Sequence, residues 1–289
     1  MKIKKLISAL VLGSMLVGLS GCNITDFSAE NLLRPPKAVG DEAEIEQLIA
    51  KTADSGYTLK YPKNGKFRSA IIMTDLDGND SNEAVAFFRN SAETSSVHML
   101  VMYSKDNSWK IASDNIFETT DIDSVDFADL TGNGKAEIIV NSTTYTPNVG
   151  KLSCYSYSEG KTNEVGSGQS CSSFVTGDFD NDGTSEIMSL VLYTTENEAL
   201  ASMLDYNEDS KSLYAKAMAN MDPNVVKYKN IAVTKLDNDI TGIVVDGTSA
   251  NEVTNTQVIF YSRDLAILRN PLFKEKAKNI TRRSSQVIC

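Results

Sequence analysis

The chain has 289 residues and a formal net charge of −10, because 38 acidic residues outnumber 28 basic ones. This balance leaves no basic patch for nucleic acid, so we expect no nucleic-acid partner. The chain holds a single histidine and none of the P-loop, G-x-S-x-G or G-x-G-x-x-G signatures, which removes the usual nucleophile and phosphate sites.

Residues 1–21 are typical of a secretion signal, since Lys2, Lys4 and Lys5 precede an apolar stretch, 6–19, that is too short for a membrane span. The stretch ends in Leu19-Ser20-Gly21-Cys22, which resembles the bacterial lipobox. The resemblance implies that Cys22 is lipidated and begins the mature chain. Two or more acyl chains give stable membrane anchoring, so the expected location is extracytoplasmic, tethered to the cell membrane.

Loss of residues 1–21 would change the formal charge from −10 to −13. The alternative is an ordinary cleaved signal with a chance cysteine.

Residues 22–40 have no periodicity and are expected to form a tether. Residues 41–51 place Ile45, Leu48 and Ile49 at helical spacing, which predicts a short amphipathic packing helix. Residues 57–61 alternate and predict a strand.

The rest of the chain is organised around residues 178–186, Asp-Phe-Asp-Asn-Asp-Gly-Thr-Ser-Glu, which place acids at positions 1, 3, 5 and 9 and glycine at position 6. Ca²⁺ takes six to eight oxygen ligands, so alternating carboxylates and a carbonyl at position 7 suit it. Ser189 stands where an EF-hand has its closing glutamate, and residues 187–192 are strand-forming. The pattern predicts a calcium loop between two strands. The alternative is a turn whose acids face water.

The same phrase recurs at 75–83 and 129–137, and in degenerate form at 235–243. The four starts are 54, 49 and 57 residues apart, close to the roughly 40 to 50 residues of a four-stranded propeller blade. An apolar run ends in tyrosine 28, 28, 28 and 26 residues after these starts, at Tyr103, Tyr157, Tyr206 and Tyr261. The repeat predicts an all-β fold, a β-propeller of four-stranded blades over residues 41–289.

Each blade is expected to contain four strands joined by short polar turns. The expected strands are 68–74, 84–88, 97–103 and 108–112; 124–128, 138–142, 152–157 and a weak one near 165; 173–176, 187–192, 201–206 and 212–218; and 231–234, 242–245, 257–261 and 265–268.

Residues 285–289 resemble the strand before each loop. Four blades and one strand leave unpaired edges, whereas a propeller closes its ring. We therefore expect the N-terminal part of a larger ring of about seven blades. The alternative is a small complete ring, closed by pairing of 57–61 with the last strand.

The phrase D-x-D-x-D-G-x-x-E before a strand resembles the FG-GAP and VCBS repeats of integrin α-subunit propellers and of many bacterial surface lipoproteins, over roughly residues 66–289. The third copy matches at every ligand position. The ligands that the resemblance implies, with the carbonyl donor fourth in each set, are Asp75, Asp77, Asn79, Ser81 and Glu83; Asp129, Thr131, Asn133, Lys135 and Glu137; and Asp178, Asp180, Asp182, Thr184 and Glu186.

The second copy has fewer charges and is expected to bind more weakly, because ligand charge tunes affinity. In the fourth copy Lys235 and Ile243 replace the first and last carboxylates, so we expect no metal there. A bound Ca²⁺ is expected to be a structural staple. Cys154 and Cys171 flank one hairpin, and the sequence leaves open whether they form a disulfide or stay reduced. His98 lies in an expected strand and is interpreted as a packing or surface residue.

Two functions remain open. The first is a non-enzymatic, lipid-anchored module that binds a protein or a glycan. The second is an extracytoplasmic carbohydrate-active enzyme, a lyase or hydrolase, that draws its acid and base from carboxylates or tyrosines. The calcium loops account for the regularly spaced acidic residues, which favours the binding module. A carboxylate pair outside the loops would favour the enzyme.

Overall fold

The computed structural model describes residues 40–54, 56–193, 196, 198–237 and 239–269. The expected secretion signal, Cys22, the expected tether up to residue 39, the strand expected at 285–289 and Cys289 lie outside these residues. In the part that is described, no helix has the length and apolar character needed to cross a membrane.

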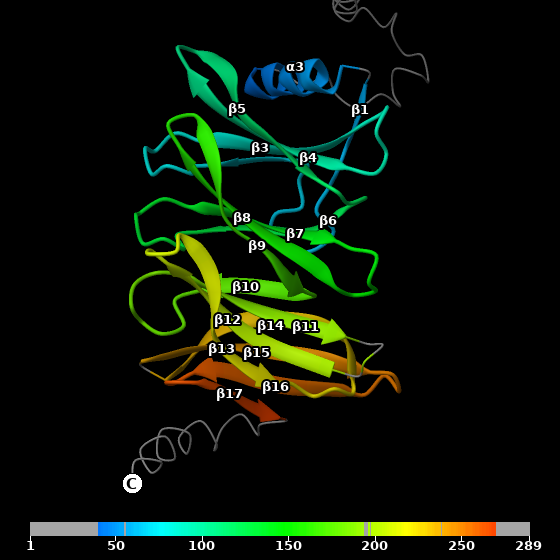
Figure 1. Ribbon diagram of the computed structural model, residues 1–289, viewed down its shortest axis with the longest axis vertical. Coiled ribbons are helices and arrows are strands. Elements are labelled where there is room, and N and C mark those ends of the chain that lie inside the picture. Colours follow the sequence, from blue (N-terminus) through cyan, green and yellow to red (C-terminus); the bar gives the residue numbers. More distant parts are fainter. Residues whose placement is uncertain (1–39, 55, 194–195, 197, 238, 270–289) are drawn as a thin grey trace, which may run out of the picture. The chain divides into compact units, whose positions relative to one another are not determined.

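The described strands form four antiparallel sheets that follow one another along the chain (Figure 1). The first sheet contains β1 (Tyr57–Leu59), β2 (Ile71–Thr74), β3 (Glu83–Asn90), β4 (Val97–Lys105) and β5 (Ser108–Phe117). The second contains β6 (Ile122–Ala128), β7 (Glu137–Thr143), β8 (Gly150–Ser158) and β9 (Lys161–Cys171). The third contains β10 (Ser173–Gly177), β11 (Glu186–Tyr193), β12 (Glu198–Asn207) and β13 (Ser212–Asn220). The fourth contains β14 (Val225–Asp237), β15 (Ile240–Ser249), β16 (Thr254–Tyr261) and β17 (Leu265–Arg269).

The all-β prediction is confirmed, and all of the strands expected within the described residues are present. From β2 onward, each sheet is a meander in which consecutive strands pair. Many strands are longer than the sequence pattern indicated, because polar residues beyond each apolar run still pair with their neighbours. Among the described strands, no pairing joins the fourth sheet to the first, so a closed ring is not shown.

Strand β1 has a different place from the one considered in the ring-closing alternative. It pairs with β3, with Tyr57 opposite Asn90 and Leu59 opposite Phe88. Strand β2 pairs with the preceding part of β3, with Ile71 opposite Ala86. The two short strands therefore share one edge of β3 and widen the first sheet.

Strands β3, β7 and β11 are apolar on both faces, because each face packs against a different neighbouring sheet or helix. In β3, Ala84, Ala86 and Phe88 belong to the core under the helix, whereas Val85 and Phe87 belong to the core shared with the second sheet. Continuous apolar runs are typical of strands that are covered on both faces.

The same alternation continues along the chain. Ile138 and Val140 of β7 face the first sheet, while Ile139 belongs to the core shared with the third sheet. In β11, Ile187 faces the second sheet and Met188 belongs to the core shared with the fourth. Consecutive sheets are thus held together by apolar side chains, which is the main favourable term in folding.

The expected helix is present as α3 (Asp41–Ala53), and its role as a packing element is confirmed (Figure 1). Ile45, Ile49 and Ala53 are buried against the face of the first sheet that the second sheet does not cover. The backbone N–H of Trp109 also donates to the carboxylate of Glu44 at 3.3 Å.

Cys154 and Cys171 are buried free thiols and do not form a disulfide. Burial raises the pKa of Cys154, and it raises the pKa of Cys171 to about 12, so both stay protonated at neutral pH. His98 is buried in β4, where it stacks on Phe88 and its Nδ1 lies 2.9 Å from Asp114 Oδ1. The interpretation of His98 as a packing residue is confirmed.

Candidate functional site

The three predicted metal loops occupy equivalent places in their sheets. Each joins two neighbouring antiparallel strands, the second of which is β3, β7 or β11. Loop 1 (75–83) joins β2 to β3, loop 2 (129–137) joins β6 to β7, and loop 3 (178–186) joins β10 to β11. Each loop starts directly after the strand that precedes it, and its position 9 is the first residue of the strand that follows. The prediction that these segments connect two strands is confirmed.

The backbone of all three loops is left-handed at positions 4 and 6. Position 4 is Gly78, Gly132 or Asn181, and position 6 is Asp80, Gly134 or Gly183, all with φ between +61° and +94°. Glycine and asparagine or aspartate tolerate this region best. The sequence pattern identified position 6 but missed position 4.

The glutamate at position 9 closes each loop. Its Oε2 accepts the backbone N–H of position 2, at 2.9 Å for Glu83 and Leu76, 2.8 Å for Glu137 and Leu130, and 2.7 Å for Glu186 and Phe179. The side chains of position 2 are all buried in the cores between the sheets. The glutamate is therefore fixed by a residue that is itself anchored in the core.

The side chains at positions 1 and 5 shape the loop by accepting backbone N–H groups. Asp75 accepts from Gly78 at 2.8 Å and from Asp80 at 2.9 Å, and Asp129 accepts from Gly134 at 2.8 Å. At position 5 the carbonyl or carboxylate oxygen accepts the N–H of position 7 in all three loops. Partial burial opposes ionisation of Asp75, but four backbone N–H groups outweigh it and lower the pKa of this carboxyl.

Loop 3 gathers all four predicted carboxylates. Asp178, Asp180, Asp182 and Glu186 each offer an oxygen, and these oxygens lie within 4.8 Å of one another. Asp178 Oδ1 and Glu186 Oε1 are buried and have no hydrogen-bond partner among the described residues. Buried polar atoms are nearly always satisfied, so two unpartnered carboxylate oxygens in one cluster fit a site that could hold a cation.

The electrostatics of Glu186 point the same way. Its side chain is 0 % exposed, and burial together with the negative charges of Asp180, Asp182 and Asp205 raises its pKa to about 8. A carboxyl group that is crowded by like charges favours the protonated form unless a cation compensates. Loop 3 therefore has the oxygen donors, the net charge and the unmet hydrogen-bonding capacity of a site for a divalent metal ion.

Loop 1 gathers three carboxylates, Asp75, Asp77 and Glu83, with oxygens within 4.8 Å of one another. Asp77 Oδ1 is buried and unpartnered among the described residues. Burial, with Asp77 and Asp75 nearby, raises the pKa of Glu83. A small cavity of about 320 Å³ lies against this loop and is lined by Asp77, Glu83, Tyr103 and Tyr157, among others. Loop 1 shares the features of loop 3 with one carboxylate fewer.

Loop 2 differs because one of its own residues, Thr131, donates hydrogen bonds to both carboxylate oxygens of Glu137. The hydroxyl group of Thr131, at position 3, donates to Glu137 Oε1 at 3.2 Å, and the Thr131 N–H reaches Oε2 at 3.3 Å. Asp129 and Glu137 are the two carboxylates of this loop. Burial raises the pKa of Glu137, but its oxygens already have donors. The structure thus gives loop 2 less need for a cation than loops 1 and 3.

The degenerate fourth copy does not form a comparable loop. Residues 235–237 end β14 and residues 240–243 begin β15, with Asp237 opposite Ile240. Without acids at positions 1 and 9, no carboxylate gathers the backbone N–H groups inward, and the two strands pair as far as Asp237 and Ile240.

Neighbouring loops contact one another across the sheet interfaces. The N–H of Ala136 in loop 2 donates to the Leu76 carbonyl in loop 1 at 3.0 Å, and the N–H of Ser185 in loop 3 donates to the Asp129 carbonyl at 2.9 Å. The recurring tyrosine of the second sheet, Tyr157, also lies near loop 1 of the preceding sheet. Burial, then Glu83 and Asp77 of loop 1, raises the pKa of Tyr157 in the second sheet to about 12.

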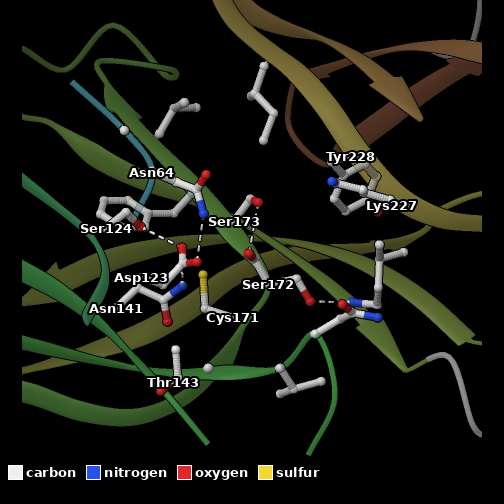
Figure 2. Close-up of a pocket in the computed structure, with 18 of the residues that line it drawn as sticks. Asn64, Asp123, Ser124, Asn141, Thr143, Cys171, Ser172, Ser173, Lys227 and Tyr228 are labelled. Carbon is white, nitrogen blue, oxygen red and sulfur yellow. Dashed lines mark hydrogen bonds between the residues drawn. The ribbon is translucent and has the colours of Figure 1, made fainter. Parts of the chain in front are cut away.

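A groove with polar and apolar lining residues lies at the opposite ends of the same strands. It has a volume of about 640 Å³ and is lined by the beginnings of β6, β10 and β14, by the ends of β7 and β11, and by residues 64–66. Figure 2 shows Asn64, Asp123, Ser124 and Asn141 clustered on one side and Lys227 on the other. Hydroxyl, amide and lysine side chains thus dominate the labelled walls.

The carboxylates at or beside this groove are engaged by groups of the chain itself. Asp123 accepts from Asn64 Nδ2 at 2.9 Å and from Ser124 Oγ at 3.1 Å (Figure 2). Asp126 accepts from Lys66 Nζ at 3.3 Å and from Thr176 Oγ1 at 3.0 Å. Asp121, next to the groove, forms ion pairs with Lys60 and Lys63.

Sequence reasoning missed three features of this region. The buried side chain at position 2 was visible as Leu76, Leu130 and Phe179 but was not interpreted. Three donors to the carboxylates at the groove, Lys63, Asn64 and Lys66, come from the irregular segment 62–66, which carries no periodic signal. An ion pair beside loop 3, between Lys216 and Asp180, joins residues 36 positions apart, and no spacing rule predicts such a contact.

Comparison with protein-family models gives no match for this chain, and comparison with curated proteins gives no significant match.

Proposed function

We propose that this chain is a calcium-stabilised, non-enzymatic binding module, built from FG-GAP/VCBS-type propeller blades and held outside the cytoplasm by a lipid on Cys22. The observation that carries the proposal is the pair of buried carboxylate oxygens in loop 3, Asp178 Oδ1 and Glu186 Oε1, that no described donor satisfies. Their neighbours in the cluster, Asp180 and Asp182, add further hard oxygen ligands.

Calcium is the ion that this donor set favours. All side-chain donors of loops 1 and 3 are oxygens, and Ca²⁺ accepts six to eight of them in flexible geometry, whereas Mg²⁺ keeps several waters and demands an octahedron. Asp178, Asp180, Asp182 and Glu186 would hold the ion in loop 3, and Asp75, Asp77 and Glu83 in loop 1. The ion would supply positive charge to a buried cluster and so stabilise the connection between two strands.

The propeller assignment rests on repetition. Four consecutive meanders of four strands, with an equivalent loop in three of them and apolar cores between successive sheets, are what blades of a propeller provide. Lipid anchoring and an extracytoplasmic location rest on the lipobox-like Leu19-Ser20-Gly21-Cys22 alone.

The groove is the proposed binding surface for a protein or a glycan. Binding sites are concave and offer a few placed polar groups, and the groove supplies hydroxyl, amide and lysine groups over about 640 Å³. Its carboxylates Asp123 and Asp126 are already held by donors of the chain. A general acid or base must exchange a proton with a substrate, so this arrangement favours binding over glycoside cleavage.

The calcium part of the proposal is tested by the metal content of the purified protein, measured by native mass spectrometry after dialysis against mixed Ca²⁺ and Mg²⁺. We expect Ca²⁺ to be retained in loops 1 and 3. Glu186→Gln should remove one ion, and the matched control Glu208→Gln, an exposed residue outside the loops, should remove none. Retention of no ion by the wild-type protein would contradict the proposal.

The binding part is tested on glycan and protein arrays with the wild-type chain and with a groove variant, Lys227→Glu with Lys229→Glu. The control variant reverses two exposed lysines outside the groove, Lys161 and Lys211. A ligand that is retained by the control and lost by the groove variant supports the assigned surface. Cleavage of an array glycan by the wild-type chain would instead support the enzyme.

A further inference from the structure

The last strands of the first three sheets, β5, β9 and β13, each contain a β-bulge at a comparable place. The extra residue of the bulge differs in chemistry from sheet to sheet. In the first sheet Val101 pairs with Ser113 and Met102 with Ile111, which leaves Ala112 without a partner on β4. In the second sheet the extra residue is Val165, and in the third sheet it is Lys216. A bulge re-aims the side chain of its extra residue, so these three side chains occupy equivalent places.

In the first two sheets the bulge residue is apolar and packs in the core toward the next sheet. Ala112 packs against the core shared by the first and second sheets, and Val165 belongs to the core shared by the second and third. In the third sheet a lysine takes this place. Its ammonium group lies 6.0 Å from the ring centroid of Tyr261 in the fourth sheet, close enough for a cation–π contact.

The Lys216 ammonium group bridges loop 3 and strand β12. It forms ion pairs with Asp180 Oδ2, a predicted metal ligand, and with Asp205 Oδ2 at 2.8 Å. The side chains of Asp180 and Asp205 are 9 % and 10 % exposed. Asp205 also accepts the hydroxyl group of Tyr214 at 3.2 Å. Asp205 directly precedes the repeat tyrosine Tyr206, a place that Met102 and Ser156 take in the first two sheets.

The third sheet therefore has two charged side chains, Asp205 and Lys216, at places where the first two sheets have uncharged residues. Both lie beside loop 3, the loop with the most carboxylates. Resting on the proposed calcium site, we propose that Lys216 is a built-in counter-cation that sets the metal affinity of loop 3. It holds Asp180 when no metal is present, and Asp205 provides the second acceptor that lets the ammonium group release Asp180. Asp180 is then free to act as a ligand without leaving Lys216 unpaired.

This role predicts opposite effects for two substitutions. Lys216→Met gives the bulge an apolar residue, as in the other two sheets, and removes a positive charge from the edge of the cluster. We expect calcium to bind loop 3 roughly tenfold more tightly, because ligand charge tunes affinity and a nearby cation opposes the ion. Asp205→Asn leaves Lys216 with Asp180 as its main acceptor, so we expect weaker binding.

The experiment is a calcium titration by calorimetry of the full chain in an Asp77→Asn background, which removes the unpartnered carboxylate of loop 1. The matched controls are Lys211→Met and Asp209→Asn, two exposed residues of the β12–β13 turn that make the same charge changes outside the cluster. Folding of every variant is checked by its melting curve. If Lys216→Met does not fold, Lys216→Gln, of similar length and without charge, replaces it.

A double variant separates the effect of Asp205 on Lys216 from its own charge, because coupled residues give non-additive changes. We expect Asp205→Asn to weaken binding much less when Lys216 is already Met. Affinity in Lys216→Met that equals the wild-type value, or falls below it, would overturn the inference while leaving the calcium site intact. No calcium binding by the parent protein would instead refute the proposed function.

Discussion

The sheets have a loop end and a groove end, and strands β6 and β10 run from one to the other. The two ends differ in how the negative charge of their carboxylates is compensated. At the loop end of β10, four carboxylates converge and two of their buried oxygens lack a donor among the described residues. At the groove end of β6, the nearby carboxylates of Asp121, Asp123 and Asp126 are satisfied by lysine, amide and hydroxyl groups of the chain. The carboxylates of the groove end have donors from the chain, whereas the loop end of β10 has buried acceptors that a cation would satisfy.

The comparison shows why a count of acidic residues is a poor guide to metal sites. The groove end has three carboxylates, one more than loop 2, yet each of them has a donor. Loop 2 itself belongs with the groove end, since the Thr131 hydroxyl group serves Glu137. Four predictions, ordered from the largest expected effect to the smallest, test this contrast.

The loop end should depend first on its anchor in the core. Phe179 is 0 % exposed and holds the backbone N–H that Glu186 accepts. We expect Phe179→Ala to lower the free energy of unfolding by about 3–5 kcal/mol, as is usual for a buried phenylalanine. Denaturant unfolding in calcium and in chelator measures this. A loss confined to the calcium buffer would show that the anchor acts only through the metal.

Loop 2 should become dependent on a cation when its internal donor is replaced by an acid. Thr131→Asp removes the hydroxyl donor of Glu137 and adds a third carboxylate. In chelator we expect a loss of about 1–3 kcal/mol of unfolding free energy, the cost of an unsatisfied buried acceptor. Calcium should restore this loss. Thr94→Asp, at an exposed threonine outside the loops, is the control. Equal stability of Thr131→Asp with and without calcium would contradict the interpretation of loop 2.

The groove end should respond to loss of a donor without any dependence on calcium. Asn64→Ala removes the amide that donates to Asp123 at 2.9 Å. We expect a loss of about 1 kcal/mol of unfolding free energy, typical for one net hydrogen bond. The loss should be the same in calcium and in chelator. A loss that calcium reverses would mean that the two ends are not independent.

The smallest effect concerns pH at the groove end. Burial disfavours the charge of Asp121, but hydrogen bonds and charge from Lys60 and Lys63 outweigh it and lower the pKa below its ordinary value of 3.8. The stabilisation is therefore present above pH 3.8 and is lost as the pH falls through the lowered pKa. Because the pair is partly exposed, we expect less than about 1 kcal/mol.

The measurement for this prediction is the denaturant midpoint of the wild type and of Asp121→Asn between pH 6 and pH 2.5. The wild type should be more stable at pH 6, and the difference should shrink toward the acid end. A difference that stays constant over this range would show that the charge of Asp121 contributes nothing.

Much of the fold could be predicted because the repeat carries it. Apolar runs and short polar turns placed all the strands that fall within the described residues, and the phrase around Asp178 placed the loops. Strand ends were missed where polar residues keep pairing, as in β14, whose alternation gave no sign of its full length from Val225 to Asp237. Pairing of β1 with β3 is a tertiary choice that no local pattern specifies.

The candidate site was predictable in its ligands but not in their electrostatic state. The spacing of Asp178, Asp180, Asp182 and Glu186 identified the cluster. The missing acids at Lys235 and Ile243 identified a copy that forms no such cluster among the described residues. The donors that separate loop 2 from loop 3 depend on side-chain geometry. Lys216 reaches the cluster from a bulge on another strand, so its role required the structure.

The most direct test of the central claim is the melting temperature of the purified protein during a calcium titration that starts from a chelated sample, with Asp178→Ala combined with Asp182→Ala as the comparison. A ligand that binds only the folded state raises its stability by mass action. We predict an upward shift in the wild type that is lost or strongly reduced in the double variant. An unchanged melting temperature in the wild type at millimolar calcium would contradict the claim that loop 3 is completed by a cation.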